Sequence, residues 1–175
     1  LKERAEKIKQ GNPLDPATTM GAMVDVNHAK KVEEFLNVGK AEAKLITGGD
    51  RFSINDSDAF IQPTIFADVS EDATIARDEI FGPVLAIQTF DTEDEAIKMA
   101  NKSVYGLAAS VWTSDLARAM DLSDRLHVGT VSVNTVDALS AMTPFGGMKQ
   151  SGFGRDLSIH SFDKYTALKT IWFKY

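Results

Sequence analysis

The segment Arg77-Asp-Glu-Ile-Phe-Gly-Pro-Val84 carries residue types that could bind a nucleoside. Glu79 and Phe81 are two residues apart, and in an extended backbone they would point to the same side. A carboxylate can accept two hydrogen bonds from vicinal hydroxyl groups such as those of a ribose. A neighbouring phenyl ring can form an apolar wall for a flat ring. The alternative places Phe81 in the core and Glu79 on the surface, and the residues alone favour that alternative.

Other patterns that could carry chemistry are incomplete. Ser161-Phe-Asp-Lys164 matches an S-x-x-K pattern, but the partner motifs of penicillin-recognising enzymes are missing. His28, His127 and His160 lack metal-ligand spacing, so we expect ordinary solvated or hydrogen-bonded histidines and no metal site. The chain has no cysteine, which excludes disulfides and a thiolate nucleophile within it.

Composition restricts the classes of protein to consider. The 175 residues are 43% hydrophobic and 25% charged, which is typical of one soluble domain or of one domain plus an appendage. A formal net charge of -6 argues against nucleic acid as a partner. No apolar stretch approaches the roughly 18 residues of a membrane span. The absence of cysteine fits a cytoplasmic location.

The N-terminal residues predict a helix whose apolar face includes the first residue. Leu1, Ala5 and Ile8 have the spacing of one helix face. The sequence opens with neither a methionine nor a signal segment. A natural first residue rarely lies on such a face, so we expect this sequence to be a piece of a longer protein.

A second helix is predicted after a proline-containing turn. Asp25 or Asn27 could cap it, and Gly39 is the expected stop. Its expected buried stripe consists of Ala29, Val32 and Phe35/Leu36.

Short strands are predicted next. A strand over 44–47 ends at two glycines, and the polar residues 50–60 indicate a loop or a hairpin. A strand over 61–66 contains Pro63, which favours an edge position because proline lacks a backbone N–H.

The second half alternates strands and capped helices. Residues 83–90 form an apolar run typical of a strand covered on both faces. Thr92 begins a capping box, and Ser114 could cap a helix reaching about residue 126. Further strands are expected over 107–112 and 129–133. This order predicts an α/β fold, a three-layer αβα arrangement with a mostly parallel sheet.

The C-terminal residues 165–175 are rich in aromatic and β-branched side chains, a composition that predicts a strand. No sequence remains to pair with it, so pairing with another subunit is expected.

Several longer motifs follow one another along the chain. They are Asn12-Pro-Leu-Asp-Pro16 with Met20-Gly21, Glu79-Ile-Phe-Gly-Pro-Val84, Tyr105-Gly-Leu-Ala-Ala109, Gly129-Thr-Val-Ser-Val-Asn134 and Pro144-Phe-Gly-Gly-Met-Lys-Gln-Ser-Gly-Phe-Gly-Arg155. In this order and spacing they resemble the NAD(P)-dependent aldehyde dehydrogenase superfamily, and the resemblance covers essentially the whole chain.

The resemblance implies how the chain is organised and what it binds. Residues 1–164 would be the C-terminal part of the catalytic domain, and residues 165–175 an oligomerisation strand of a homodimer or homotetramer. NAD or NADP would be the cofactor. Glu79 would hold the nicotinamide ribose, Phe81 would pack near the nicotinamide, and Leu107 would lie near the cofactor's reactive end.

The resemblance also implies part of an aldehyde pocket after Asn134. Its candidates are Asp137, Leu139 and Phe145. Phe145 could equally be a core aromatic, and Asp137 could simply form a turn. As a site residue, Asp137 could hold a cationic substrate tail. The segments 135–143 and 158–165 look most like dehydrogenases of amino- and guanidino-aldehydes, such as γ-glutamyl-γ-aminobutyraldehyde and guanidinobutyraldehyde.

The family's nucleophilic cysteine, general-base glutamate and oxyanion-hole asparagine would lie upstream of this sequence. We therefore expect the isolated chain to be inactive, while the longer protein oxidises aldehydes to carboxylic acids. The competing hypothesis is a non-catalytic α/β domain that dimerises and binds a partner or a nucleotide.

Overall fold

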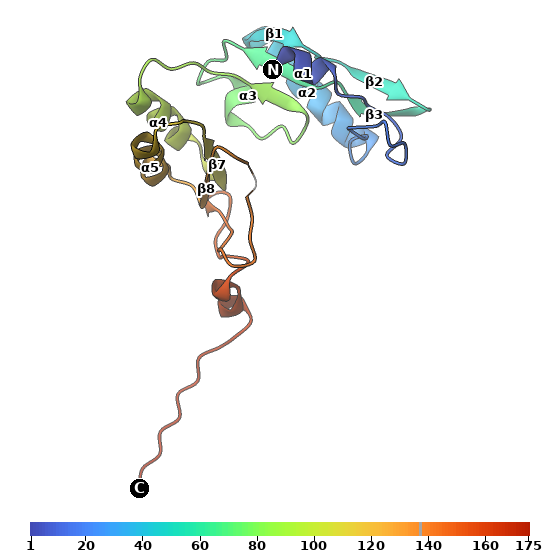
Figure 1. Cartoon of the computed structure of the whole chain (residues 1–175). Coiled ribbons are helices and arrows are strands. Elements are labelled where there is room, and N and C mark those ends of the chain that lie inside the picture. Colours follow the sequence, from blue (N-terminus) through green and yellow to red (C-terminus); the bar gives the residue numbers. More distant parts are fainter. Residues whose placement is uncertain (137) are drawn as a thin grey trace. The chain divides into compact units, whose positions relative to one another are not determined.

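The computed structural model describes residues 1–136 and 138–175 and has an α/β fold (Figure 1). The α/β class predicted from the sequence is confirmed. The chain divides into two compact units, Leu1–Thr89 and Phe90–Tyr175, and each unit is described by itself.

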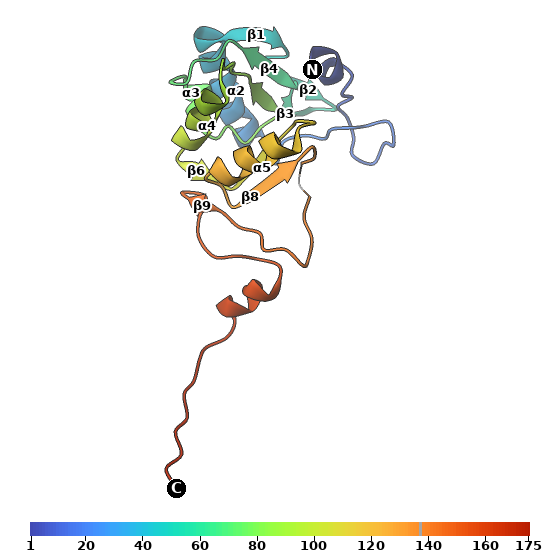
Figure 2. The same cartoon turned by 60° about the vertical axis from the view of Figure 1, so that its left-hand side comes forward.

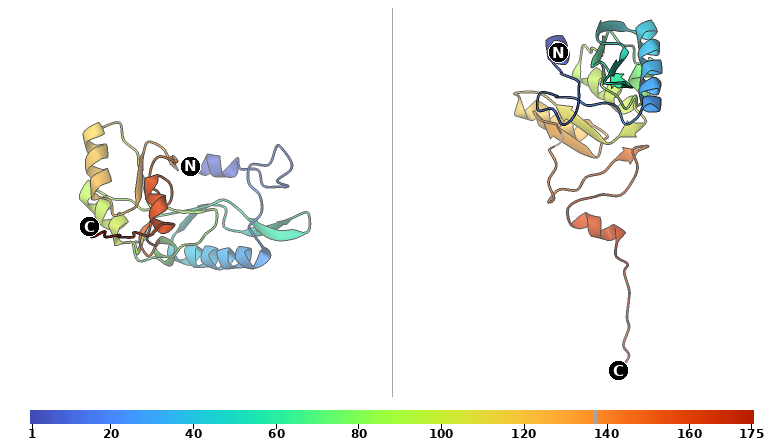
Figure 3. Two further views of the ribbon diagram at one scale, coloured as in Figure 1. Left: turned by 90° about the horizontal axis from the view of Figure 1, so that it is seen from below. Right: turned by 90° about the vertical axis from the view of Figure 1, so that its right-hand side faces the viewer.

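The first unit combines a long helix with short strands. A three-stranded sheet has the order β1-β4-β5, in which β1 and β4 are antiparallel and β4 and β5 parallel. The strands β2 and β3 form a separate antiparallel pair, and α2 packs against β3 and α3 (Figure 3). The elements are α1 (Lys2–Glu6), α2 (Val26–Glu42), β1 (Lys44–Thr47), β2 (Arg51–Ile54), β3 (Ser57–Ile61), β4 (Thr64–Ala67), α3 (Thr74–Arg77) and β5 (Val84–Ala86).

The helix α2 begins where the sequence allows it but ends later than expected. Asp25 is the cap, because its Oδ1 accepts a hydrogen bond of 2.7 Å from the backbone N–H of His28. The helix continues through Gly39 to Glu42, so the predicted stop at Gly39 is wrong. A Cβ at Gly39 would lie 2.8 Å from the ring of Phe66. Glycine therefore makes room for a core ring instead of ending the helix.

The core of the first unit lies between α2 and the strands. The predicted stripe is confirmed, because Ala29, Val32 and Leu36 are fully buried, while Phe35 is half-buried. The core cluster consists of Ala29, Val32, Leu36, Ile61, Phe66, Val69, Ala73 and Ile75.

The polar segment after β1 forms a hairpin. Asn55 and Asp56 connect β2 and β3 with φ angles of 49° and 64°. Positive φ at both central residues is the requirement of a type I′ turn, whose twist matches that of the paired strands. The hairpin alternative is therefore confirmed.

Two strand predictions in this unit need correction. Pro63 lies between β3 and β4, and β4 is the central strand of its sheet rather than an edge. Because Pro63 stands outside both strands, its missing N–H interrupts neither of them. The strand expected over 83–90 is limited to β5. Leu85 of β5 is 44% exposed, so this strand is not covered on both faces within the chain.

The second unit contains a parallel strand pair with a helical crossover. The strands β7 and β8 pair in parallel (Figure 1), and α5, which lies between them in the sequence, packs against β7 (Figures 1 and 2). The predicted strand–helix–strand unit is confirmed here, whereas β6 and β9 pair antiparallel. Each unit therefore contains both parallel and antiparallel strand pairs. The elements are α4 (Glu93–Lys102), β6 (Tyr105–Gly106), β7 (Ala108–Val111), α5 (Leu116–Arg125), β8 (Thr130–Val133), β9 (Met148–Lys149) and the 3-10 helix η1 (Ile159–Lys164).

The two helices of this unit have side-chain caps. Thr92 caps α4 by accepting from the N–H of Glu95 at 3.2 Å, as predicted. The carboxylate of Glu95 reaches back and accepts from the N–H of Asp91 at 2.8 Å. The cap of α5 is Asp115, which accepts from the N–H of Arg118 at 3.1 Å. The expectation of Ser114 as this cap was wrong by one residue.

An arginine links α4 and α5. Arg125 donates hydrogen bonds to the carboxylates of Asp94 on α4 and Asp121 on its own helix. The hydrogen bond with Asp94, followed by that with Asp121, raises the pKa of Arg125 above its ordinary value.

The C-terminal residues form no strand within this chain. Residues 166–175 run as an exposed, extended segment beyond η1 (Figures 1 and 3), and their backbone makes no hydrogen bond to any other residue that the structure describes. Over the described ranges, no helix has the length and apolar character needed to cross a membrane.

Candidate functional site

The candidate nucleoside-binding residues lie on an irregular loop between α3 and β5. Phe81 has φ +55°, so the backbone at this residue is not extended. Glu79 and Phe81 therefore do not meet the condition under which residues two apart point to the same side, which is an extended strand conformation. Both side chains are exposed, Phe81 to 74%, so Phe81 is not a core residue of this unit. Glu79 has no hydrogen-bond or ion-pair partner among the described residues.

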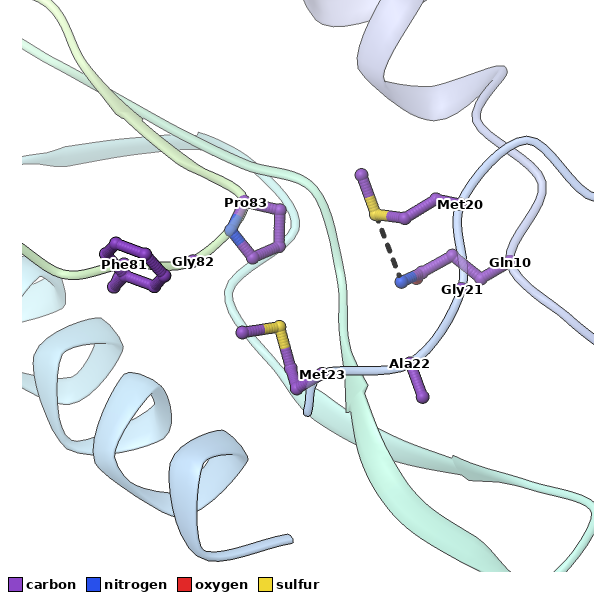
Figure 4. A pocket seen from close by; sticks show the side chains of 8 residues that line it. All are labelled: Gln10, Met20, Gly21, Ala22, Met23, Phe81, Gly82 and Pro83. Atoms are coloured by element: carbon purple, nitrogen blue, oxygen red, sulfur yellow. Dashed lines mark hydrogen bonds between the residues drawn. The ribbon is translucent and has the colours of Figure 1, made fainter. Parts of the chain in front are cut away.

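A cavity of about 480 Å³ lies beside this loop in the first unit. Figure 4 shows Met20 and Met23 approaching Pro83 across the cavity, so thioether and pyrrolidine groups form much of its wall. The residues that line it are Gln10, Met20, Gly21, Ala22, Met23, Phe81, Gly82 and Pro83. Such a wall suits a flat, largely apolar part of a ligand.

The one amide in this wall is fixed by its own hydrogen bonds. Gln10 Nε2 donates to the carbonyl of Ile61 at 2.8 Å and contacts Met20 Sδ at 3.4 Å. Gln10 therefore links the segment between α1 and α2 to β3 at this wall of the cavity.

His28 contacts the loop from the first turn of α2. Its Nε2 lies 2.8 Å from the carbonyl oxygen of Phe81, and the two rings meet edge to face with centroids 6.1 Å apart. The expectation of an ordinary hydrogen-bonded histidine is confirmed. Its partner could not be found from the sequence, because the two residues are 53 positions apart.

The second unit brings two of the predicted pocket residues together. Leu139, 54% exposed, and the half-buried Phe145 line a cavity of about 370 Å³. Phe145 is held in place by a two-way backbone bridge with Asp156, with N···O distances of 2.8 and 2.7 Å. The third predicted residue, Asp137, lies outside the described residues.

The same cavity contains hydroxyl groups that the sequence reasoning missed. Thr130 and Ser132 of β8 pair with Ala108 and Ser110 of β7, so alternation along the strands places all four side chains on one face. Thr130 Oγ1 is buried and finds no hydrogen-bond partner among the residues described. The period-two pattern of small and hydroxylated residues was the signal that could have revealed this face. The complete lining is Ala108, Ala109, Ser110, Thr130, Ser132, Val136, Ala138, Leu139 and Phe145.

Leu107 lies between β6 and β7 and is 43% exposed. Its carbonyl accepts a hydrogen bond of 3.1 Å from the N–H of Thr130, but its side chain is not part of the cavity lining. The second unit therefore brings Leu139 and Phe145 together at one cavity and leaves Leu107 outside the lining of that cavity. In the first unit, Phe81 lines a cavity, whereas Glu79 is not part of its lining. No cluster of three or more His, Asp or Glu side chains suited to a metal ion occurs within residues 1–136 and 138–175.

Comparison with known proteins identifies the class. The chain matches the model of the "Aldehyde dehydrogenase family" over residues 1–171. This chain belongs to the aldehyde dehydrogenase family, as the motifs indicated.

Three similar proteins illustrate the match. The NADP/NAD-dependent aldehyde dehydrogenase PuuC of Escherichia coli (strain K12) is 48% identical over 172 residues, which are 98% of this chain and 34% of PuuC. Betaine aldehyde dehydrogenase 1 of Rhizobium meliloti (strain 1021) is 48% identical over 174 residues, 98% of this chain and 36% of that protein. The structure of the P. syringae indole-3-acetaldehyde dehydrogenase AldA in complex with NAD+ and IAA has a TM-score of 0.94 and 46% identity. That match covers 99% of this chain and 35% of the AldA chain. The chain thus spans about a third of the length of the relatives it matches.

Proposed function

We propose that this chain is the C-terminal part of an NAD(P)-dependent aldehyde dehydrogenase that oxidises aldehydes to carboxylic acids. The observation that carries the proposal is the family match, which extends over residues 1–171. The relatives are about three times as long as this chain, so the remaining catalytic groups would come from sequence outside it.

The loop of Glu79 and Phe81 would hold the nicotinamide riboside end of the cofactor. The exposed carboxylate of Glu79 has no partner among the described residues, so its lone pairs are available to ribose hydroxyls. The exposed Phe81 ring beside an apolar cavity suits a flat heterocycle. When bound, the nicotinamide supplies hydride acceptance. The AldA structure contains NAD+ and the PuuC relative is described as NADP/NAD-dependent, which supports NAD or NADP here. In the second unit, Leu107 is the residue proposed to lie near the reactive end of the cofactor.

The cavity of the second unit would form part of the aldehyde pocket. Leu139 and Phe145 supply apolar walls, and the hydroxyl-bearing face of β7 and β8 supplies polar groups. Apolar walls with a few placed polar groups are typical of small-molecule pockets.

Cationic amino- or guanidino-aldehydes are the proposed substrates. Relatives at 48% identity include a betaine aldehyde dehydrogenase, and betaine aldehyde also carries a positive charge. Asp137 would be the anion that receives the cationic end of the substrate, because a carboxylate pairs strongly with an ammonium or guanidinium group.

Assembly belongs to the same proposal. The extended residues 166–175 would pair with a neighbouring subunit in a homodimer or homotetramer, because their backbone groups are unpaired within the described chain. The absence of cysteine in the chain supports a cytoplasmic location.

The full-length protein that contains this chain tests the proposal. It should reduce NAD+ or NADP+ in the presence of an aldehyde, measured by absorbance of the reduced nicotinamide. Aldehydes with a terminal amino or guanidino group should have a higher kcat/KM than neutral aldehydes of the same length. The isolated chain should give no turnover. Full-length protein that reduces neither cofactor with any aldehyde would contradict the proposal, and a preference for the neutral aldehydes would contradict the substrate class.

A further inference from the structure

The loop that carries Glu79 and Phe81 needs support from other parts of the fold. It belongs to no helix or strand, and Phe81 adopts φ +55°, a left-handed conformation that is unfavourable for a residue with a side chain. The Phe81 side chain is 74% exposed, so burial of the ring contributes little to holding this conformation. A non-glycine residue stays in this region when the surrounding structure fixes it.

Two contacts fix the residues that follow Phe81 in the loop. Gly82 lies against α2, where a Cβ would come within 2.9 Å of Val32 Cγ1. The carbonyl of Pro83 accepts from the N–H of Thr64 at 2.8 Å, which aligns the start of β5 with β4. These contacts hold the residues that follow Phe81 but not its own peptide group.

The peptide group of Phe81 is held by His28. A carbonyl oxygen only accepts, so the 2.8 Å contact requires a proton on His28 Nε2. The imidazole also meets the Phe81 ring edge to face, at an interplanar angle of 76°. The backbone of His28 is fixed at the start of α2, because its N–H donates to the capping carboxylate of Asp25 at 2.7 Å.

We propose that His28 is a positioning residue for the cofactor-binding loop. By donating a hydrogen bond to the Phe81 carbonyl, it holds Phe81 in its left-handed conformation and sets where the Glu79 carboxylate stands, two residues earlier. This inference rests on the proposed function, because it assigns His28 to the loop that would receive the nicotinamide riboside.

The matched variants are His28→Leu and His28→Gln in the full-length protein. Leucine replaces the imidazole with an apolar side chain and so removes the Nε2–H donor. The Gln Nε2 stands the same number of bonds from the backbone as the His Nε2, and it keeps a donor. Loss of one hydrogen bond predicts an increase of about two- to tenfold in the KM and Kd for NAD+ in His28→Leu. The kcat at saturating NAD+ and the KM for aldehyde should remain near those of the wild type.

His28→Gln should restore the KM and Kd for NAD+ to within about twofold of the wild type. The control is His160→Leu, because His160 is an exposed histidine whose Nδ1 lies 3.9 Å from a carboxylate oxygen of Asp163 in its own 3-10 helix. This control should behave as the wild type. If His28→Leu does not fold, His28→Asn takes its place, because its side chain is one bond too short to reach Phe81.

The outcomes separate the inference from the proposed function. Wild-type full-length protein that neither binds nor reduces NAD+ or NADP+ contradicts the proposed function itself. If the wild type is active and the donor-free variant has an unchanged KM and Kd for NAD+, the role of His28 is overturned. A Gln variant as impaired as the Leu variant also overturns it, because the hydrogen bond would then not be the cause.

Discussion

At the residue scale, the backbone conformation of Phe81 could not be predicted from the neighbouring sequence. The spacing of Glu79 and Phe81 suggested alternation along an extended strand, but Phe81 has φ +55°. The partner that holds it, His28, is 53 residues away, so the cause of the conformation lies in tertiary structure. The residue types were sufficient to nominate Glu79 and Phe81, but the geometry that presents them was not predictable from their spacing.

A glycine in the same loop allows a direct test of its packing. In Gly82→Ala, the new Cβ would lie 2.9 and 3.0 Å from the two Cγ atoms of the buried Val32, closer than van der Waals contact permits. We expect the free energy of unfolding of this chain in urea to fall by about 1–3 kcal/mol.

The matched control for this substitution is Gly21→Ala, on the wall of the same cavity. An added Cβ there meets no heavy atom within 4 Å, so its stability should be close to that of the wild type. Equal stabilities of the two variants would show that the loop does not pack against α2 as the structure has it.

The pocket residues of the second unit were also predictable from the sequence only in part. Leu139 and Phe145 were nominated by resemblance and share one cavity. The hydroxyl face that completes the cavity depends on the pairing of β7 with β8, which places Thr130 and Ser132 opposite Ala108 and Ser110. This pairing could be anticipated from the strand–helix–strand order, but its register could not.

At the element scale, signals that act within a few residues were predicted well. The capping box at Thr92 and the hairpin over 50–60 each depend on groups close in sequence. The errors occurred where distant contacts decide. Gly39 is inside α2 because the ring of Phe66 needs the space, and Pro63 separates two strands instead of lying in an edge strand.

The cap of α4 gives a measurable contribution to stability. Thr92→Ala removes the hydroxyl that accepts from the N–H of Glu95, leaving a helix-terminal donor unpaired. The free energy of unfolding should fall by about 1 kcal/mol, measured by urea denaturation followed by circular dichroism. Thr92→Ser keeps the oxygen and should lose much less. Loss of the same size in both variants would mean that the hydroxyl is not the cause.

At the scale of the whole chain, the two units bury their apolar residues unequally. The core cluster of eight buried residues belongs entirely to the first unit. In the described part of the second unit, only Val111 and Ala119 are buried hydrophobic residues, while Trp112, Leu116 and Met120 are largely exposed. Under the proposed function, sequence outside this chain would cover such surfaces, because the chain spans about a third of the length of its relatives. This surface pattern is visible only in three dimensions, although the family was already recognisable from its motifs.

The central claim is that this chain supplies the carboxylate that holds the nicotinamide ribose. The most direct measurement is the KM for NAD+ of the full-length enzyme carrying Glu79→Ala, compared with wild type and with Glu34→Ala, an exposed carboxylate on α2. Loss of hydrogen bonds to a charged group predicts an increase of at least about tenfold in KM for NAD+. The KM for aldehyde and the behaviour of Glu34→Ala should remain close to wild type. A KM for NAD+ in Glu79→Ala equal to that of Glu34→Ala would contradict the account.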